Sequence, residues 1–309
     1  MTRTYTPATT ANTASDTSKG LAISFMGGLL LSFDVPLLKM AGADTYTLIY
    51  VRGIMMFAAM FLFWLLFTRL RGSPTPFING KTGLVIALFA GVSNIMFISS
   101  ISLTSVANVV FILAFNPMFA GLLGWAFLGE RLHPYTWAAI LVSLCGVGII
   151  VQEGLQVGTW RGDLLAVGVA ALMAMSLTVI RHQRSDQSMS AASGHLLAAA
   201  VVAPFASPGS LSAAGWGWLA MNGLLAAPAA TALLMLGPRY VAAAVVAMFF
   251  LLETVLTPVW MWAIFAEVPS AQAMFGGAVV ILALVSHSVW KLLSSRRQIP
   301  ADEMGRILA

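Results

Sequence analysis

Charged side chains are scarce in this sequence. Only 9% of its 309 residues are Asp, Glu, Lys or Arg, whereas 59% are hydrophobic. A soluble domain normally carries about 25% charged residues, so this chain has too little polar material to cover a soluble surface. The apolar surplus must face lipid, and a lipid bilayer is the first partner that the sequence predicts.

Cysteine and histidine are scarce as well, which excludes several kinds of site. The single cysteine, Cys145, lies in an apolar run, so neither a disulfide framework nor a cysteine-based metal site can form within one chain. Four scattered histidines and the lack of HExxH, GxSxG, Walker or GxGxxG motifs in a suitable context argue against a catalytic centre. We therefore expect a protein that is not an enzyme and that binds no metal and no cofactor.

The apolar residues form long runs. A helix that crosses about 30 Å of hydrocarbon needs about 20 largely apolar residues. The sequence thus predicts an all-α integral membrane protein with ten transmembrane helices. The ten windows are Gly20–Leu38, Tyr46–Phe67, Thr82–Leu103, Ser105–Leu128, Pro134–Val151, Leu164–Ile180, Met189–Ala206, Trp216–Leu236, Val241–Ala266 and Gln272–Leu293.

The basic residues predict how the chain is oriented. In a soluble protein, a net charge of +5 and a pI of about 9.7 would suggest nucleic acid as a partner. Here 13 of the 16 Lys and Arg residues lie on one side if the N-terminus is inside, whereas only Lys39 and Arg161 lie outside and Arg52 lies within a helix. By the positive-inside rule, both polar tails are cytoplasmic (1–19, expected to be disordered, and 294–309), and no nucleic-acid partner is expected.

The two halves of the sequence resemble each other. At an offset of 142 residues the first helix overlays the sixth, and at 143 Arg52 falls on His195. At an offset of 137 Asn116 falls on Glu253. A repeat with five spans has an odd number of crossings, so its two copies must be inverted, as in many secondary transporters. The predicted repeats cover residues 20–152 and 160–293.

Three short patterns resemble one known family. Arg52 comes early in the second helix, residues 103–107 form a nearly loopless hairpin, and Asn116-Pro117 is followed by a Gly-Glu-Arg-Leu turn at 129–132. This combination resembles the drug/metabolite transporter superfamily in its EamA-type branch. The second half departs from the pattern, because Glu267 lacks the preceding Gly and Thr254 stands where the family often has Pro.

The resemblance implies a carrier of the cell inner membrane that exports small metabolites and has both termini in the cytoplasm. The long helices rich in Met, Phe and Trp look most like exporters of aromatic and other hydrophobic amino acids. Cationic drugs or other metabolites are the alternative substrates. A receptor or subunit that does not transport, and a channel, are the alternatives from other classes.

Several polar residues lie at membrane depth, where a charge costs about 2.5–3.5 kcal/mol on insertion scales. Glu253 and Asn116 both fall near mid-depth and could line a central substrate cavity, with Glu253 binding an ammonium group or a coupling proton. They could instead bond neighbouring helices. The same two readings apply to Asn94 and Ser176.

The aromatic residues around Glu253 also have two readings. Phe249 and Trp260 share its helical face, so they predict an aromatic wall beside the carboxylate. Plain packing is the alternative.

A second cluster is expected towards the outer side. Pro36 removes the helical hydrogen bond to the carbonyl of Ser32, which frees backbone beside Asp34. Asp34 and Arg52 lie at similar depth on consecutive helices, so they could form a structural ion pair, or Asp34 could gate the outer mouth. His195, expected nearer the inner side, is either a packing residue or a proton relay.

Overall fold

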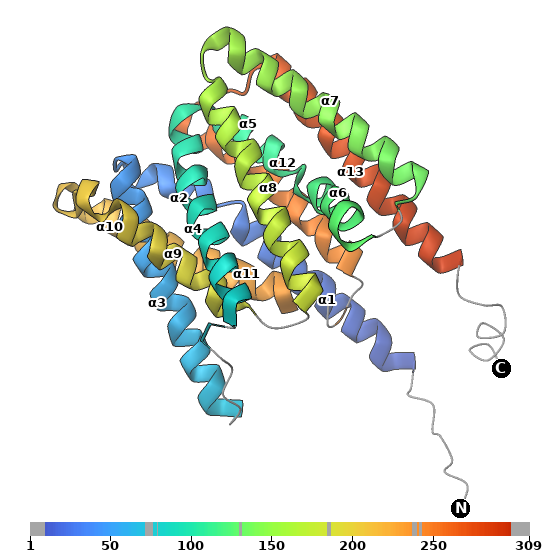
Figure 1. Ribbon diagram of the computed structural model, residues 1–309, viewed down its shortest axis with the longest axis horizontal. Coiled ribbons are helices and arrows are strands. Elements are labelled where there is room, and N and C mark those ends of the chain that lie inside the picture. Colours follow the sequence, from blue (N-terminus) through green and yellow to red (C-terminus); the bar gives the residue numbers. More distant parts are fainter. Residues whose placement is uncertain are drawn as a thin grey trace, which may run out of the picture.

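The computed structural model describes residues 10–71, 77–78, 80–129, 132–183, 187–236, 240 and 243–297. Within these residues the protein is built from helices and contains no strand (Figure 1). The helices are α1 (Thr10–Leu31), α2 (Asp34–Met40), α3 (Thr45–Arg71), α4 (Gly80–Leu103), α5 (Val106–Leu113), α6 (Asn116–Leu128), α7 (Pro134–Val157), α8 (Trp160–Gln183), α9 (Ser188–Val202), η1 (Ala203–Phe205), η2 (Pro208–Ser210), α10 (Ala213–Ala220), η3 (Met221–Ala226), α11 (Ala227–Leu236), α12 (Ala243–Phe265) and α13 (Ala271–Arg297).

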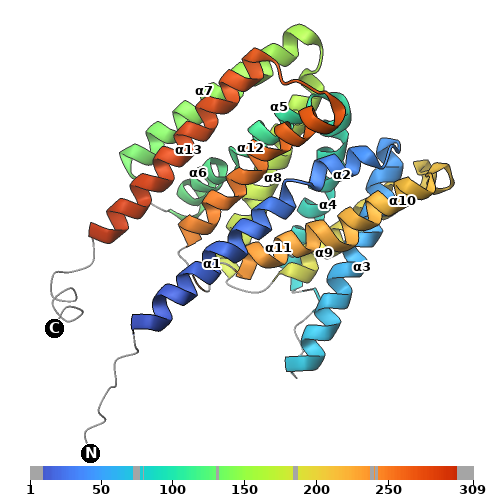
Figure 2. The ribbon, with the colours of Figure 1, turned by 180° about the vertical axis from the view of Figure 1, so that it is seen from behind.

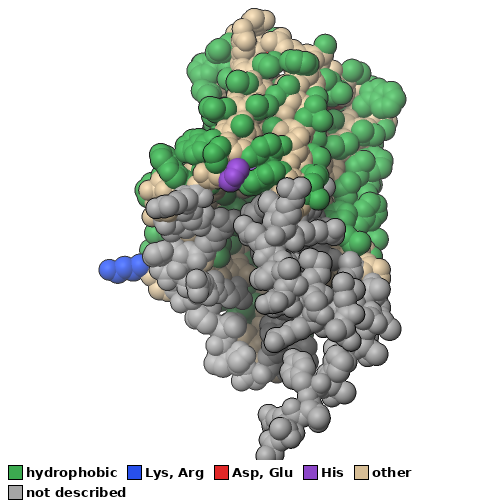
Figure 3. Space-filling model, turned by 90° about the vertical axis from the view of Figure 1, so that its right-hand side faces the viewer, with side chains coloured by type: hydrophobic (Ala, Val, Ile, Leu, Met, Phe, Trp, Pro, Cys, Tyr) green, Lys and Arg blue, Asp and Glu red, His purple; other side chains and the backbone are tan. Residues whose placement is uncertain are grey.

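The predicted membrane fold is confirmed. The described residues contain nine helical stretches that are long and apolar enough to cross a bilayer, and a shorter apolar stretch, Phe249–Phe265, lies in α12 at the place of the ninth predicted helix. Figure 3 shows the corresponding surface: hydrophobic side chains cover most of the described part of that face, and no acidic side chain is visible there. A surface of this kind suits lipid rather than water.

The predicted polar tails are shorter than expected. α1 begins at Thr10, so residues 10–19 are helical where a disordered tail was expected, and α13 extends to Arg297. Helices can continue past the hydrocarbon because their backbone hydrogen bonds are internal. The rest of both predicted tails lies outside the described residues.

Three of the spans are irregular in the middle. The first is interrupted between α1 and α2, and the fourth between α5 and α6; Pro36 and Pro117 lie in the first turns after these breaks. The eighth contains η3, a π-helical turn, just before Pro228. Proline cannot donate a backbone hydrogen bond, so each break leaves carbonyl groups that need other partners.

The two repeats interlock. α1 of the first repeat lies between α11 and α12 of the second (Figure 2). In the corresponding way, α8 of the second repeat packs against α4, α5 and α6 of the first. The second and seventh spans, α3 and α9, pack on each other, as do the fifth and tenth, α7 and α13 (Figure 1). This exchange of partners is what two inverted five-helix repeats require.

The molecule has two ends along the direction of the spans. The first turn of α1 and the last turn of α13 point to the same side (Figure 1), which we call the proximal end. The opposite side, the distal end, is formed by the connections 41–44, 104–105, 158–159, 203–212 and 266–270.

Candidate functional site

The break between α1 and α2 is held by α12. The carbonyl of Ser32, which Pro36 frees from its helical bond, accepts a hydrogen bond from the hydroxyl of Thr257 at 3.1 Å. The indole of Trp260 donates to the Ser32 hydroxyl at 3.0 Å, and its ring stacks on Phe33 with 4.8 Å between centroids. The predicted loss of helical bonding at Ser32 is therefore compensated by side chains of the second repeat.

A buried ion pair follows immediately after this break. Asp34, the first residue of α2, accepts hydrogen bonds from Nη2 of Arg52 at both carboxylate oxygens, at 3.0 and 3.1 Å. Each of the two residues is only 5% exposed. Arg52 also lies over the ring of Phe97, 5.9 Å from its centroid. Hydrogen bonds between two charged groups are roughly twice as strong as those between neutral groups.

Two buried amides complete the pair and join the repeats. Arg52 donates from Nη1 to Oδ1 of Asn94 at 2.8 Å and from Nε to Oδ1 of Asn222 at 3.0 Å. Asn222 donates in turn to the carbonyl and to Oδ1 of Asp34, both at 2.9 Å. We call Asp34, Arg52, Asn94 and Asn222 the central network. Asn222 comes from the second repeat, so the network ties η3 to α2, α3 and α4.

The sequence reasoning missed Asn222. An amide within the apolar window 216–236 was a usable signal, because a polar group in hydrocarbon needs a partner. The π-helical turn that directs it to Asp34 left no comparable signal.

Two titratable side chains flank the central network. His195 and Glu253 each lie within electrostatic range of Asp34 and Arg52. The carbonyl of His195 packs on Gly53, where a Cβ atom would lie only 2.5 Å from it, so His195 is nearer to Arg52 than its expected depth implied.

Three side chains in or beside the central network keep unused hydrogen-bonding capacity. Glu253 is partly exposed and has no hydrogen bond to a described residue, and Nδ1 of His195 and Nδ2 of Asn94 have no partner there either. They are the groups in this region that a polar ligand could bind. No cluster of three or more His, Cys, Asp or Glu side chains among the described residues could hold a metal ion.

The other candidate residues are bonded or packed within the helix bundle. Asn116 donates to the carbonyl of Ala170 in α8 at 3.1 Å, rather than bonding to Glu253. Ser176 donates to the carbonyl of Leu172 within its own helix. Phe249 meets Phe25 of α1 edge to face at 6.4 Å. Phe249, Glu253 and Trp260 thus lie along the side of α12 that faces α1.

The distal ends of the repeats are joined by polar contacts. Lys39 forms an ion pair with Glu267, whose other oxygen accepts from the backbone N–H of Val106 at 3.0 Å. The hydroxyl of Thr47 accepts from the N–H of Ser207 at 2.9 Å. Ser270 also donates to Glu153 of α7 at 2.7 Å.

The fourth span runs from these distal contacts to the proximal end. Its distal part, α5, packs against α8, α12 and α13, whereas its proximal part, α6, packs mainly against α8. Both parts share α7 and α8 as neighbours, and the part on the distal side of the break at residues 114–115 also packs against α12 and α13.

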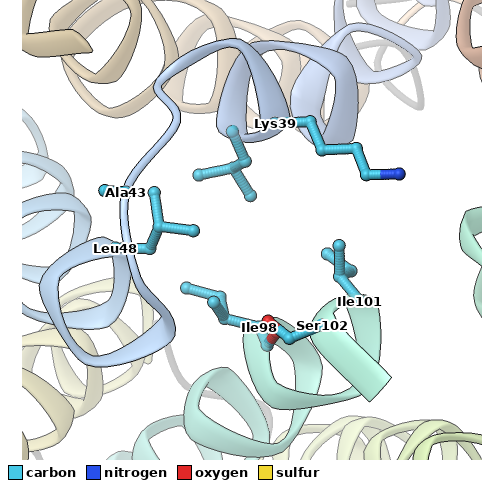
Figure 4. Close-up of a pocket in the computed structure, with 7 residues that line it drawn as sticks. Lys39, Ala43, Leu48, Ile98, Ile101 and Ser102 are labelled. Atoms are coloured by element: carbon cyan, nitrogen blue, oxygen red, sulfur yellow. The ribbon is translucent and has the colours of Figure 1, made fainter. Parts of the chain in front are cut away.

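Two cavities lie beside these contacts. The first, of about 120 Å³, is at the distal end; Figure 4 shows Leu48, Ile98 and Ile101 pointing into it while Lys39 runs along its rim. The second, of about 380 Å³, lies between α1–α2 and η3–α11. Its lining is wholly apolar: Leu30, Phe33, Leu37, Met221, Leu225, Ala226 and Ala229.

The comparisons with known proteins agree with this architecture. No curated protein matches the chain. A crystal structure resembles it with a TM-score of 0.61 over 87% of this chain and 96% of the other, at 17% identity, a likeness that shows the fold alone. The profile of the EamA-like transporter family matches twice, at residues 18–152 and 160–288, once for each repeat. The chain therefore belongs to the EamA-like transporter family and is a multi-pass membrane transporter of small molecules.

Proposed function

We propose that this protein exports small metabolites, most of all aromatic and other hydrophobic amino acids, across the cell inner membrane by alternating access. The observation that carries the proposal is the way the two repeats meet. They are joined at the distal end through Lys39, Glu267, Thr47 and Ser207, and through Asn222 in the central network, while Thr136 of α7 and His287 of α13 are bonded at the proximal end. By the positive-inside rule the distal end faces outwards and both termini are cytoplasmic, so this arrangement is closed to the outside.

The residues around Glu253 suit a substrate with a cationic group and an apolar body. The carboxylate of Glu253 has no hydrogen-bond partner among the described residues and is partly exposed, so it is available to an ammonium group. Phe249 and Trp260 flank it on the same face of α12. Aromatic rings beside a carboxylate favour aromatic amino acids, and they would also accept amphipathic cations.

The helix breaks provide the places where the repeats can move. Interrupted helices near the midplane are a recurrent feature of carriers whose halves rock around a central site. The central network holds η3 against α2, α3 and α4, so these elements would move together. Glu253, beside this unit, is the candidate acceptor for a coupling proton.

Counterflow in liposomes tests the proposal. Purified protein is reconstituted and loaded with unlabelled substrate, and uptake of labelled aromatic amino acids, aliphatic amino acids and quaternary ammonium drugs is compared. Saturable exchange that is fastest for aromatic amino acids supports the proposal, whereas preference for the drugs supports the alternative substrate class. Flux without saturation or counterflow indicates a channel. No movement of any of these compounds indicates a receptor or a subunit.

Replacing Glu253 by Gln tests the proposed binding and proton site. The change keeps the shape of the side chain but removes its negative charge, so transport should fall about ten-fold or more if an ion pair with the substrate is lost, and its dependence on pH should flatten. Asp44→Asn, an acid-to-amide change in the distal connection before α3, is the matched control and should retain the wild-type pH profile. Wild-type transport at every pH in Glu253→Gln would remove this residue from the mechanism.

A further inference from the structure

A second buried carboxylate lies away from the central network. Asp163, in the first turn of α8, is 0% exposed. Its Oδ1 accepts hydrogen bonds from the hydroxyl of Thr104 at 2.7 Å and from the amide of Asn108 at 3.1 Å. Its Oδ2 has no hydrogen-bond partner among the described residues. Half of this carboxyl group is therefore buried without compensation.

Backbone packing encloses the unpaired oxygen. Gly154 of α7 lies against Oδ2, so closely that a Cβ atom at this position would be only 1.9 Å from it. Glycine at residue 154 is thus required for α7 and α8 to enclose Asp163. The side chain is sealed between α7, α8 and the turn that joins α4 to α5.

The charges around Asp163 do not balance a negative carboxylate. On α7 the facing charge is Glu153, which adds repulsion. On the 266–270 connection Glu267 is also acidic, and it is already paired with Lys39. On α8 itself, the guanidinium of Arg161 lies over the ring of Trp160, 5.6 Å from its centroid. The dipole of α8 favours a negative charge in its first turn, but that effect amounts to about 0.3–1 kcal/mol when exposed and up to about 2 when partly buried, less than the cost of an isolated buried carboxylate.

We propose that Asp163 is a proton-binding site that stays protonated while the distal end is closed and can lose its proton when that end opens. This inference rests on the alternating access proposed above, but not on the substrate. The proton exchanges between a carboxylate oxygen and water while the distal end is open, and it is retained when that end closes. The protonated group is neutral and keeps its bonds from Thr104 and Asn108, so it fits the sealed site. The ionised group fits only where water reaches it.

The location of Asp163 couples it to closure. Thr104 and Asn108 lie on either side of Val106 at the turn between α4 and α5. The backbone N–H of Val106 donates to Glu267 of the second repeat. Separating the repeats at this turn would withdraw the two donors from Asp163 and admit water. Protonation therefore favours the closed distal end, and deprotonation favours the open one. The equivalent position in the first repeat, at the offset of 142 residues, is the apolar Leu21. This repeat-related position therefore offers no second proton site at the proximal end.

Infrared spectroscopy tests the bound proton directly and needs no transport. Wild-type protein in liposomes near neutral pH should show a protonated carboxyl band that shifts when aspartate is labelled with ¹³C, and this component should be missing in Asp163→Asn. Labelling distinguishes aspartate from Glu253 even if the variant does not fold. Absence of an aspartate component in the wild type, or its persistence in a folded Asp163→Asn, would overturn the proposal.

Thiol labelling tests the coupling to closure. In a Cys145→Ala background, a cysteine at Ala43, which lines the distal cavity, reports on opening to a membrane-impermeant reagent added at the distal side. After correction for the pH dependence of the thiol itself, its reactivity should rise with pH, by up to about ten-fold per pH unit when one proton is released on opening. In Asp163→Asn it should remain low at every pH, because asparagine resembles the protonated acid, whereas in Asp44→Asn it should follow the wild type.

The remaining outcomes are also decisive. An unchanged pH response in Asp163→Asn contradicts the coupling, and a response to Na⁺ at fixed pH indicates a cation site in place of a proton site. If the titration is present but no substrate moves, the proposed transport function fails and the proton site stands.

Discussion

Two buried aspartates, Asp34 and Asp163, occupy similar positions and have opposite surroundings. Each lies in the first turn of a helix and each joins the two repeats, but Asp34 has a guanidinium and an amide at its carboxylate whereas Asp163 has only a hydroxyl and an amide. All the oxygens of Asp34 are bonded, and Oδ2 of Asp163 is not. The first site can hold a permanent charge, and the second holds its carboxyl group best when it is neutral.

The contact made by the central network is therefore expected to stay intact, whereas the contact around Asp163 can be made and broken. A buried ion pair with complete hydrogen bonding is costly to break, because removing one partner leaves an uncompensated charge in the interior. A neutral acid with two donors can instead gain or lose a proton as its access to water changes. The central network therefore suits the part of the protein that stays together, and Asp163 suits the part that separates.

The largest effect should come from removing one partner of the central ion pair. Arg52→Gln leaves Asp34 buried without a cation and should destabilise the protein by about 3–5 kcal/mol; Asp34→Asn should do the same for Arg52. The exchange Asp34→Arg/Arg52→Asp should cost less than either single change, because Asn94 and Asn222 can rotate their amides to suit either charge. Thermal unfolding in detergent measures all three. Equal losses would show that the attraction between the two charges is not what matters.

The next effect tests how tightly Asp163 is enclosed. Gly154→Ala places a methyl group on Oδ2 and should cost about 1–3 kcal/mol by overpacking. Gly148 is the matched control on the same helix, since a Cβ atom there meets nothing within 4 Å; Gly148→Ala should be neutral or should stabilise by up to about 1 kcal/mol.

A double-mutant cycle isolates the contact itself. In an Asp163→Ala background the oxygen that the methyl group would strike is absent, so the additional cost of Gly154→Ala should largely disappear. If that cost persists, the helix backbones rather than Asp163 limit the packing, and the seal around the carboxyl group is looser than the structure implies.

Much of this architecture could be predicted from sequence because it depends on simple quantities. The length of apolar runs determines the ten spans, and the bias of Lys and Arg predicts their direction. The proline rule identified the free carbonyl of Ser32, which Thr257 now binds. Depth along consecutive helices was enough to suggest that Asp34 could meet Arg52.

The remainder depends on how each helix is rotated. The spans are apolar on all sides, so no polar face reveals which side of a helix looks inwards. Asn116 and Glu253 share the same depth, but Asn116 faces α8. Asp163 has no sequence signal that marks it as a site, because sequence spacing does not reveal that Thr104, Asn108 and Gly154 converge on it.

The smallest effect concerns an exposed acid that serves as a reference for both buried ones. Asp44, in the connection before α3, accepts hydrogen bonds from the N–H groups of Tyr46 and Thr47, both at 3.0 Å, and so caps the helix. Slight burial tends to raise the pKa of Asp44, but these bonds, together with one from the Thr47 side chain, outweigh it and lower that pKa below its ordinary value of 3.8. Because the folded-state pKa is lowered, the stabilisation is complete above the ordinary value and disappears as the pH falls through the lowered one.

Asp44→Ala should therefore cost about 0.5–1 kcal/mol near pH 7, as for loss of an N-cap, and progressively less at lower pH in thermal unfolding curves. A cost that does not decrease in acid would mean that the charge of Asp44 contributes nothing to the cap, and it would weaken Asp44→Asn as the reference for an acid that stays ionised while Asp163 titrates.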